Sequence, residues 1–487
     1  MNKNIFKTMI LSSAFVCGFT SCDLDQYPYD SIVTETAWQT IDDAERFRTG
    51  IYSYLRSISG GKYMYISDLQ SDLFNATISY SNNGGDMHRW DFTAAQYDIE
   101  DTWSGCYKTI NNCNNIIQNI GTITLESDEE KAEANNIKGE ALFIRALCYH
   151  NLAIRFAKDY DPSTASSNLG LPIVLEMDPM GKPSRSNLEE TYKQIKNDIN
   201  EARTLLNVQG EANSTYLTID ALNLFEARVD LYMHDYQNAI TLAKEVMTKY
   251  PLIDNKEGLS SMWLNDESSE IIFRSYQSVD ERANAMDMYL SYSTASEAFS
   301  PYYVPSKWVY DLYEDGDIRK DVFFIKSKIT CLDQSVEDVY MLNKFPGNPS
   351  LKKTEYEYYN MAKLFRSAEA YLIAAEAAYM INDANAIQYL NTLRTKRGAS
   401  ELNVSGENLM NAIEEEWIRE FVGEGMRIDQ LKRWNKGMKR HDPQNTTILM
   451  SGNGFTDFSK DASDIRFVWE IPNNDLNANS NLVGNWE

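Results

Sequence analysis

Two pairs of amphipathic helices, each joined by a short polar turn, most constrain what this chain can fold into. In the first pair, Leu222, Phe225 and Val229 recur every three or four residues before a turn at 234–235, and apolar residues resume at that spacing beyond it. The stretch AEAYLIAAEAAYMINDANAIQYLNTLRTKRGA repeats this arrangement much later in the chain. Small residues at the helix contacts permit close antiparallel packing, so the pattern predicts two helical hairpins.

Hairpins of this kind look like tetratricopeptide units, which are roughly 34 residues each. The two copies are irregular and far apart, which favours an irregular helical scaffold over a regular solenoid. Apolar periodicity and helix start signals predict further helices at residues 101–120, 129–155 and 187–206, the last with an Asn cap.

Two segments break the helical pattern, at about residues 60–100 and 251–360. The first is rich in Gly, Ser, Asn and Tyr, and the second contains strand-like runs such as EIIFRSY and DVFFIKSK. The predicted fold is therefore mainly α. Irregular tetratricopeptide-like hairpins at about 101–250 and 361–436 form a scaffold, and loop-rich segments with a few short β-strands overlie it. We expect function to concentrate in these loops.

The first residues have the features of a secretory signal. Lys3 and Lys7 precede an apolar run at 9–19, which is too short to cross a bilayer as a helix, and small residues lead to Cys22. A cysteine at the expected cleavage point resembles a bacterial lipoprotein signal, which implies that Cys22 becomes the acylated first residue of the mature chain. An ordinary signal with an incidental cysteine is the alternative. The sequence predicts a signal peptide at 1–21 and a single domain at 22–487 that begins with an acidic tether.

The formal net charge of −25 at pH 7 argues against two classes of partner. Nucleic acid and anionic lipid both require a positively charged protein surface. The sequence contains no GxSxG, HExxH, P-loop or GxGxxG motif, and its 4 histidines are scattered. We therefore expect a protein that is not an enzyme and has no cofactor, with a structural calcium ion left open. The enzyme alternative is a helical surface glycosidase, although the 71 acidic residues single out no carboxylate pair.

Six segments, in order, resemble the SusD/RagB family of surface nutrient-binding lipoproteins. They are CDLDQYP, WSGCYKTINNCNNII, GEALFIRALCYHNLAIRFA, the alanine-rich hairpin, EEEWIREFVGEGMRIDQLKRWNKG and IPNNDLNANSNLVGNWE. The resemblance implies a lipid-anchored protein on the outer membrane of a Gram-negative bacterium, facing outward. It also implies a lid that captures oligosaccharide for a SusC-like, TonB-dependent barrel transporter, with the tetratricopeptide-like side packed on the transporter. Because some relatives capture peptide, a peptide or another nutrient is the alternative ligand.

A glycan site needs aromatic rings for the flat faces of sugars and polar side chains for their hydroxyls. The family's ligand site draws on the first loop-rich segment, which supplies Tyr80, Asn82, Asn83, Asp86, Arg89 and Trp90. The second loop-rich segment supplies Tyr289, Tyr302 and Tyr303. Core packing is the alternative for Trp90. A turn is the alternative for Asn82 and Asn83, because Asn and Gly favour turns.

A charged helical stretch at 414–434 is predicted to be structural rather than a partner surface. Its arginines and acids, including Arg419, Glu420 and Arg433, are expected to hold helices together as ion pairs. The run at 414–416, which consists of three glutamates, is expected to be a solvated face.

Overall fold

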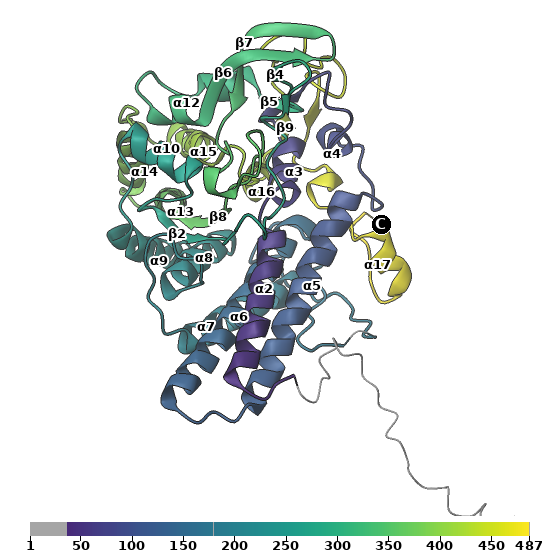
Figure 1. The fold of residues 1–487 in the computed structure, drawn as a ribbon, viewed down its shortest axis with the longest axis vertical. Helices are drawn as coiled ribbons and strands as arrows, with labels where there is room; N and C mark the ends of the chain where they lie inside the picture. Colours follow the sequence, from purple (N-terminus) through teal and green to yellow (C-terminus); the bar gives the residue numbers. More distant parts are fainter. Residues whose placement is uncertain (1–36, 179, 487) are drawn as a thin grey trace, which may run out of the picture.

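A computed structural model describes residues 37–178 and 180–486 of the protein (Figure 1). The predicted signal peptide and the proposed anchor Cys22 lie outside the described residues. Within the described ranges, no helix is both long enough and apolar enough to span a membrane. The fold is mainly helical with a few short strands, which confirms the predicted fold class.

The long helices form a bundle that runs along the long axis of the molecule (Figure 1). They are α2 (Ile41–Ser57), α5 (Tyr97–Asn119), α6 (Asp128–Phe156) and α7 (Leu188–Leu205). Helix α6 packs against the other three, and its second half is therefore buried almost all round. The predicted cap of α7 is confirmed, because the Asn187 side chain accepts a hydrogen bond from the Glu190 backbone N–H at 2.8 Å.

Both predicted hairpins form, and they pack on one another although they are far apart in the sequence. They consist of α8 (Ile219–Tyr232) with α9 (Tyr236–Lys249), and α13 (Ser367–Met380) with α14 (Ala386–Lys396). Helix α13 contacts α8, α9 and α14, and its alanines are buried on every side. Helix α15 (Glu407–Phe421) packs against α13 and α14 and completes this second helical layer.

Short elements join the two helical groups and cover one end of the molecule. The short helices are α3 (Lys62–Gln70), α4 (Gly85–Arg89), α10 (Lys256–Leu264), α11 (Lys307–Asp311), α12 (Ile318–Phe323), α16 (Arg427–Arg433) and α17 (Asn473–Ala478). Because α3 and α4 lie within residues 60–100, this segment is more helical than the sequence predicts.

The strands form small sheets rather than one large one. They are β1 (Phe74–Ala76), β2 (Ile271–Arg274), β3 (Tyr292–Ser293), β4 (Ala298–Phe299), β5 (Tyr303–Pro305), β6 (Phe324–Cys331), β7 (Gln334–Leu342), β8 (Lys363–Arg366), β9 (Met438–Lys439) and β10 (Ser459–Lys460). One sheet has the order β3-β4-β6-β7, and the others are the pairs β1–β5, β2–β8 and β9–β10. The long β6–β7 hairpin lies at the top of Figure 1. Both strand-like runs predicted from the sequence contribute a strand, β2 and β6.

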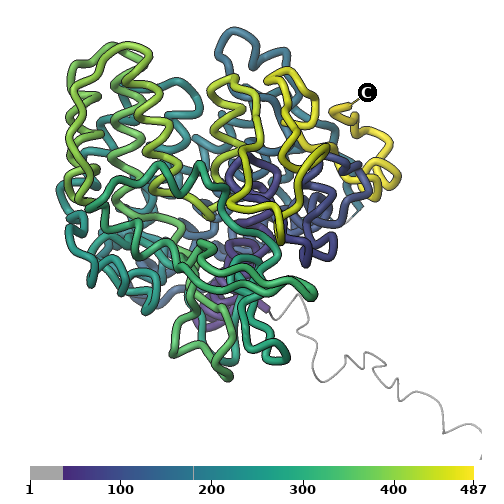
Figure 2. Tube along the Cα trace, turned by 90° about the horizontal axis from the view of Figure 1, so that it is seen from above, coloured from purple at the N-terminus to yellow at the C-terminus, as the bar shows by residue number. Residues whose placement is uncertain are grey.

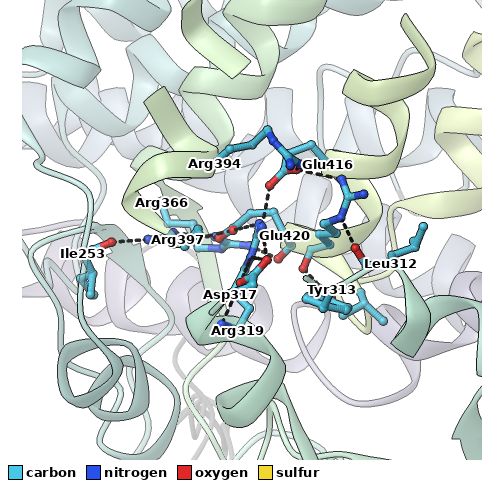
Figure 3. Close-up of polar contacts among 12 residues, drawn as sticks. Ile253, Leu312, Tyr313, Asp317, Arg319, Arg366, Arg394, Arg397, Glu416 and Glu420 are labelled. Carbon is cyan, nitrogen blue, oxygen red and sulfur yellow. Dashed lines mark hydrogen bonds and ion pairs between the residues drawn. The ribbon is translucent and has the colours of Figure 1, made fainter. Parts of the chain in front are cut away.

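Helices α13 to α15 are joined to the preceding loops by a buried ionic cluster (Figure 3). Glu420 is fully buried and pairs with Arg319, Arg366 and Arg397. Burial alone would raise the pKa of Glu420, but the three guanidinium groups hold it well below its usual value. Arg397 also donates to both oxygens of buried Glu270, at 2.7 and 2.9 Å. The predicted structural role is therefore confirmed for Glu420 and its arginine partners.

The expectation of a solvated glutamate face at 414–416 is wrong for two of its three residues. Glu416 is fully buried and accepts hydrogen bonds from Arg394 at 2.8 Å and Arg419 at 2.9 Å (Figure 3). Glu414 is nearly buried and pairs with Lys436. Helix α15 has partners on more than one side, so acidic residues on those sides face arginine and lysine side chains rather than water.

The C-terminal segment returns to the helices at the start of the chain, as the yellow and purple segments of Figure 2 show. The Glu470 carboxylate accepts hydrogen bonds from the backbone N–H groups of Ile471, Asn485 and Trp486. Arg185, just before α7, donates to the Val483 carbonyl at 3.0 Å and to the Asn485 side chain at 2.8 Å. The last residues therefore close one side of the long bundle.

Candidate functional site

The two groups of predicted ligand residues, far apart in the sequence, meet through the pairing of β1 with β5. These strands are antiparallel, with Ala76 opposite Tyr303. Beyond them, the Tyr303 hydroxyl donates to the Asn83 carbonyl at 2.7 Å, and its ring lies edge-on to Tyr80 at 6.2 Å. The strand pair therefore holds the loop that precedes α4 against the segment that contains Tyr302 and Tyr303.

A third segment, residues 448–455, packs beside β1 and Tyr80, although the sequence analysis did not single it out. Its Ile448 carbonyl accepts from the Ile78 N–H, and its Met450 N–H donates to the Ala76 carbonyl, both at 2.9 Å. Phe455 then packs edge-on against Tyr80 at 5.9 Å. The signal that could have identified this segment is the stretch SGNGF, which ends in an aromatic residue after two glycines. It mirrors the first segment, where the aromatic Tyr80 precedes the glycine-containing stretch SNNGG.

The polar side chains around α4 form one connected group. The Arg89 guanidinium donates to the Tyr80 hydroxyl at 2.8 Å and to Asp86 at 2.9 Å. Asn82 donates to the same Asp86 oxygen at 3.3 Å. We call Tyr80, Asn82, Asp86, Arg89 and Phe455 the Tyr80 surface. It offers a ring edge together with hydroxyl, amide, carboxylate and guanidinium groups, which can donate to and accept from sugar hydroxyls.

The turn before α4 explains how this group is held. Asn82 has a φ of 58° and Gly84 a φ of 63°, in the left-handed region that Asn and Gly tolerate best. A Cβ at Gly85 would lie 2.1 Å from the Asn82 side chain and 2.8 Å from Arg89, so only glycine leaves them room. Asn82 therefore combines the turn role with a place on the exposed surface. Asn83 is also exposed, but the bond from Tyr303 is made by its backbone carbonyl.

Three of the predicted ligand rings are core residues in the structure. Trp90 is 2% exposed and donates from its indole to the Gln70 carbonyl at 2.8 Å. Tyr289 is stacked on Phe74 with ring centroids 4.6 Å apart, and Tyr303 has no exposed surface. Burial leaves these rings no face for a ligand, so the structure gives them packing roles in place of the expected contact. Tyr302 is half-buried against the same core.

Buried Arg440 fixes the floor beneath the Tyr80 surface. It donates to the carbonyls of Leu69 and His88, at 2.9 and 2.8 Å, and contacts the His88 imidazole. Since Leu69 lies in the last turn of α3, this bond ties α3 to α4. Burial lowers the pKa of Arg440 to about 9 and also holds the pKa of His88 well below its usual value. The bonds of Arg440 therefore hold α3 and α4 together beneath the surface, and burial favours the neutral form of the His88 imidazole.

A second aromatic group lies on the small sheet that adjoins the Tyr80 surface. Tyr292 of β3 is stacked on Tyr356, with ring centroids 4.0 Å apart and planes 8° from parallel. Tyr356 is 39% exposed, so this tyrosine stack presents a ring to solvent. The same sheet reaches the Tyr80 surface at the turn of the β6–β7 hairpin, where the Leu332 N–H donates to the Ser79 hydroxyl at 3.0 Å.

Fold and surface together define a helical scaffold whose loops present rings and polar side chains at one end. The family profile described as "SusD family" matches residues 325–487, and the profile described as "Starch-binding associating with outer membrane" matches residues 24–231. The chain belongs to the SusD family.

Known relatives agree with this assignment along most of the chain. A SusD-like protein of Formosa agariphila is 23% identical over 478 residues, which cover 85% of this chain and 87% of that protein. A SusD superfamily protein from Bacteroides thetaiotaomicron is 26% identical, with a TM-score of 0.79 over 92% of this chain and 100% of that chain. A laminarin-binding SusD-like protein shares the fold, with 20% identity and a TM-score of 0.71 over 92% of this chain and 100% of that one.

Proposed function

We propose that this protein captures glycan at the cell surface and passes it to a SusC-like, TonB-dependent barrel transporter without catalysing a reaction. The observation that carries the proposal is the convergence of three distant segments into one exposed surface. That surface places the polar groups around Arg89 beside the Phe455 ring, with the tyrosine stack on the adjoining sheet. Rings for sugar faces and hydrogen-bonding groups for hydroxyls are the features that a glycan site requires.

Electrophoresis through gels that contain different polysaccharides tests glycan capture. We expect at least one glycan to retard the protein, and Arg89→Gln to reduce the retardation because it removes the donors to Tyr80 and Asp86. Arg46→Gln is the matched control, since the Arg46 side chain is 70% exposed and pairs with Asp43 on the same helix, α2. If no polysaccharide retards the protein and no barrel protein co-purifies with it, the proposal fails.

A peptide is the alternative ligand, because the fold itself does not select between nutrients. Calorimetric titration of the purified protein with oligosaccharides and with short peptides separates the two. Heat from sugars alone supports the glycan proposal, whereas heat from peptides alone replaces it. Release of reducing ends from a bound polysaccharide would instead show a glycosidase.

The location at the outer membrane is proposed to depend on an acyl chain at Cys22. Cys22→Ala should leave the fold intact but release the protein from the membrane fraction, whereas Cys17→Ala, within the predicted signal peptide, should not. The comparison uses a strain without the transporter, so that the anchor alone can hold the protein. Membrane association of the Cys22→Ala variant in that strain would rule out the anchor.

A further inference from the structure

A partly open cavity of about 140 Å³ lies in the helical scaffold and shares no lining residue with the Tyr80 surface or the tyrosine stack. Two of its walls are formed by α6, through His150, Asn151 and Arg155, and by α16, through Asp429 and Gln430. The two helices are fixed to one another, because the ammonium of half-buried Lys432 donates to the Ala157 carbonyl at 2.8 Å and to the Ile154 carbonyl. The walls are therefore held at a defined separation.

Polar groups without partners face this cavity. His150 is fully buried, and neither of its ring nitrogens has a hydrogen-bond partner among the described residues. Asp429 is 4% exposed, and its carboxylate makes no hydrogen bond or ion pair with the described part of the chain. Buried polar groups are almost always hydrogen-bonded, so the two ring nitrogens of His150 call for a partner. The cavity is therefore built to be filled by something that can donate and accept hydrogen bonds.

The charges that remain unpaired in the cavity are of opposite sign. Arg228 is held by Glu369, Lys363 by Asp266 and Arg433 by Glu376. In contrast, Arg155 has no carboxylate partner among the described residues. Its guanidinium makes a long contact of 3.4 Å to the Ser67 hydroxyl and lies 5.7 Å from the centre of the Trp469 ring. Burial raises the pKa of Asp429, and among the cations around it the Arg155 guanidinium opposes that rise most strongly, although the two form no direct ion pair. Burial also holds the pKa of His150 well below its usual value, so the imidazole adds no competing charge.

The volume sets the size of a ligand. A cavity of about 150 Å³ accommodates a molecule of six heavy atoms such as benzene. We propose that this cavity binds a small zwitterion, an α-amino acid the size of alanine, whose ammonium donates to Asp429 and whose carboxylate accepts from Arg155. The amides of Asn151 and Gln430 lie on the same walls, and Ile154 and Met64 supply apolar contact for a short side chain. This site is separate from the proposed glycan surface and does not depend on it.

Calorimetry with the full mature chain tests the proposal through three probes of similar size. L-alanine carries both charges, L-lactate lacks the ammonium and L-alaninol lacks the carboxylate. We expect alanine to bind and each analogue to bind at least about tenfold more weakly, because each loses a charge-assisted hydrogen bond in a buried place. A crystal soaked in alanine should show it between α6 and α16. No heat from alanine, with water alone in the cavity of the soaked crystal, overturns the proposal, as does equal binding of all three probes.

Asp429→Asn supplies an independent test of the proposed contact with the ammonium of the ligand. It keeps the shape of the side chain but removes the charge, so alanine should bind at least about tenfold more weakly while glycan retardation is unchanged. Asp442→Asn, at an exposed position, is the matched control and should bind alanine as the parent does. Unchanged alanine binding by Asp429→Asn contradicts the proposed contact. If thermal melting shows that this variant does not fold, the three-probe comparison on the unaltered chain still decides the matter.

Discussion

The buried ionic cluster of α15 and the polar group of the Tyr80 surface are built from the same types of side chain. They differ in how much of those side chains remains exposed to solvent. In the cluster, the Glu420 carboxylate pairs with three arginine side chains of the protein, and none of the residue's surface is exposed. At the surface, the Arg89 and Asp86 side chains pair with each other but remain 21% and 40% exposed. Arginine–carboxylate pairs therefore hold the scaffold together where helices enclose them, and remain available to a ligand where loops carry them.

Removing the shared acid of the cluster should have the largest effect on stability. Glu420→Gln leaves three buried guanidinium groups without their common carboxylate, and we expect the free energy of unfolding to fall by about 3–5 kcal/mol. Urea unfolding followed by circular dichroism measures this. Glu415→Gln is the control on the same helix, because that side chain is 47% exposed, and it should cost less than about 0.5 kcal/mol. Equal losses in the two variants would contradict the contrast between buried and exposed pairs.

Replacing Trp90 tests whether a ring beneath the Tyr80 surface contributes packing rather than ligand contact. Trp90→Ala should lower the free energy of unfolding by about 3–5 kcal/mol, because it empties a buried site and removes the bond to Gln70. Glycan affinity, measured at a temperature where the variant is folded, should change little. A large loss of affinity with full stability would place Trp90 in the ligand site after all.

Asp68 offers a buried acid that lacks the arginine partners of Glu420. Burial raises its pKa to about 7, one carboxylate oxygen accepts from the Gly425 N–H, and the other has no partner among the described residues. The folded state therefore binds an extra proton between pH of about 4 and 7, and stability should fall as the pH rises through that window. Asp68→Asn should remove this decline and be more stable than the parent above pH 7, by about 1–3 kcal/mol.

Thermal unfolding at pH values from 4 to 8 gives the two stability profiles for this comparison. Asp91→Asn, whose parent side chain is 66% exposed, should leave the profile of the parent protein unchanged. Parallel profiles for the parent and Asp68→Asn would show that Asp68 does not titrate in this window.

The smallest effect on stability should come from the tyrosine stack. Tyr356→Ala removes a partly exposed ring, so the free energy of unfolding should change by no more than about 0.5 kcal/mol. Glycan affinity should fall about three- to tenfold, the loss of one ring contact. Tyr216→Ala is the control, because Tyr216 is also exposed but packs against Tyr52 of α2. Equal glycan affinity in both variants would remove the stack from the site.

The helical scaffold could be predicted because its signals are local. The spacing of Leu222, Phe225 and Val229 gives α8 directly, and the Asn187 cap gives the start of α7. The glutamates at 414–416 show the limit of this reasoning. A charged residue is expected to be solvated until its partners are known, and the partners of Glu416 lie on other segments of the chain.

The candidate site was harder to predict because it depends on pairings between short, distant strands. The three residues of β1 and of β5 carry no periodic signal, yet their pairing brings Tyr80 and Tyr303 together. The loop-rich regions themselves could be identified from composition. Which rings in them are buried could not, because Trp90 and Tyr356 differ in tertiary surroundings rather than in sequence pattern.

The hydrogen bonds from Arg185 to the C-terminal segment affect the order of folding. Arg185 and Val483 are separated by 298 positions, and the tail they fix closes the bundle formed by the first helices. Contacts between such distant positions form slowly, and this one requires the last residues to have been synthesised. A chain that leaves the ribosome with this topology should keep its first helices open until translation ends. Its structure therefore delays its own completion until the C-terminal segment is available to close the bundle.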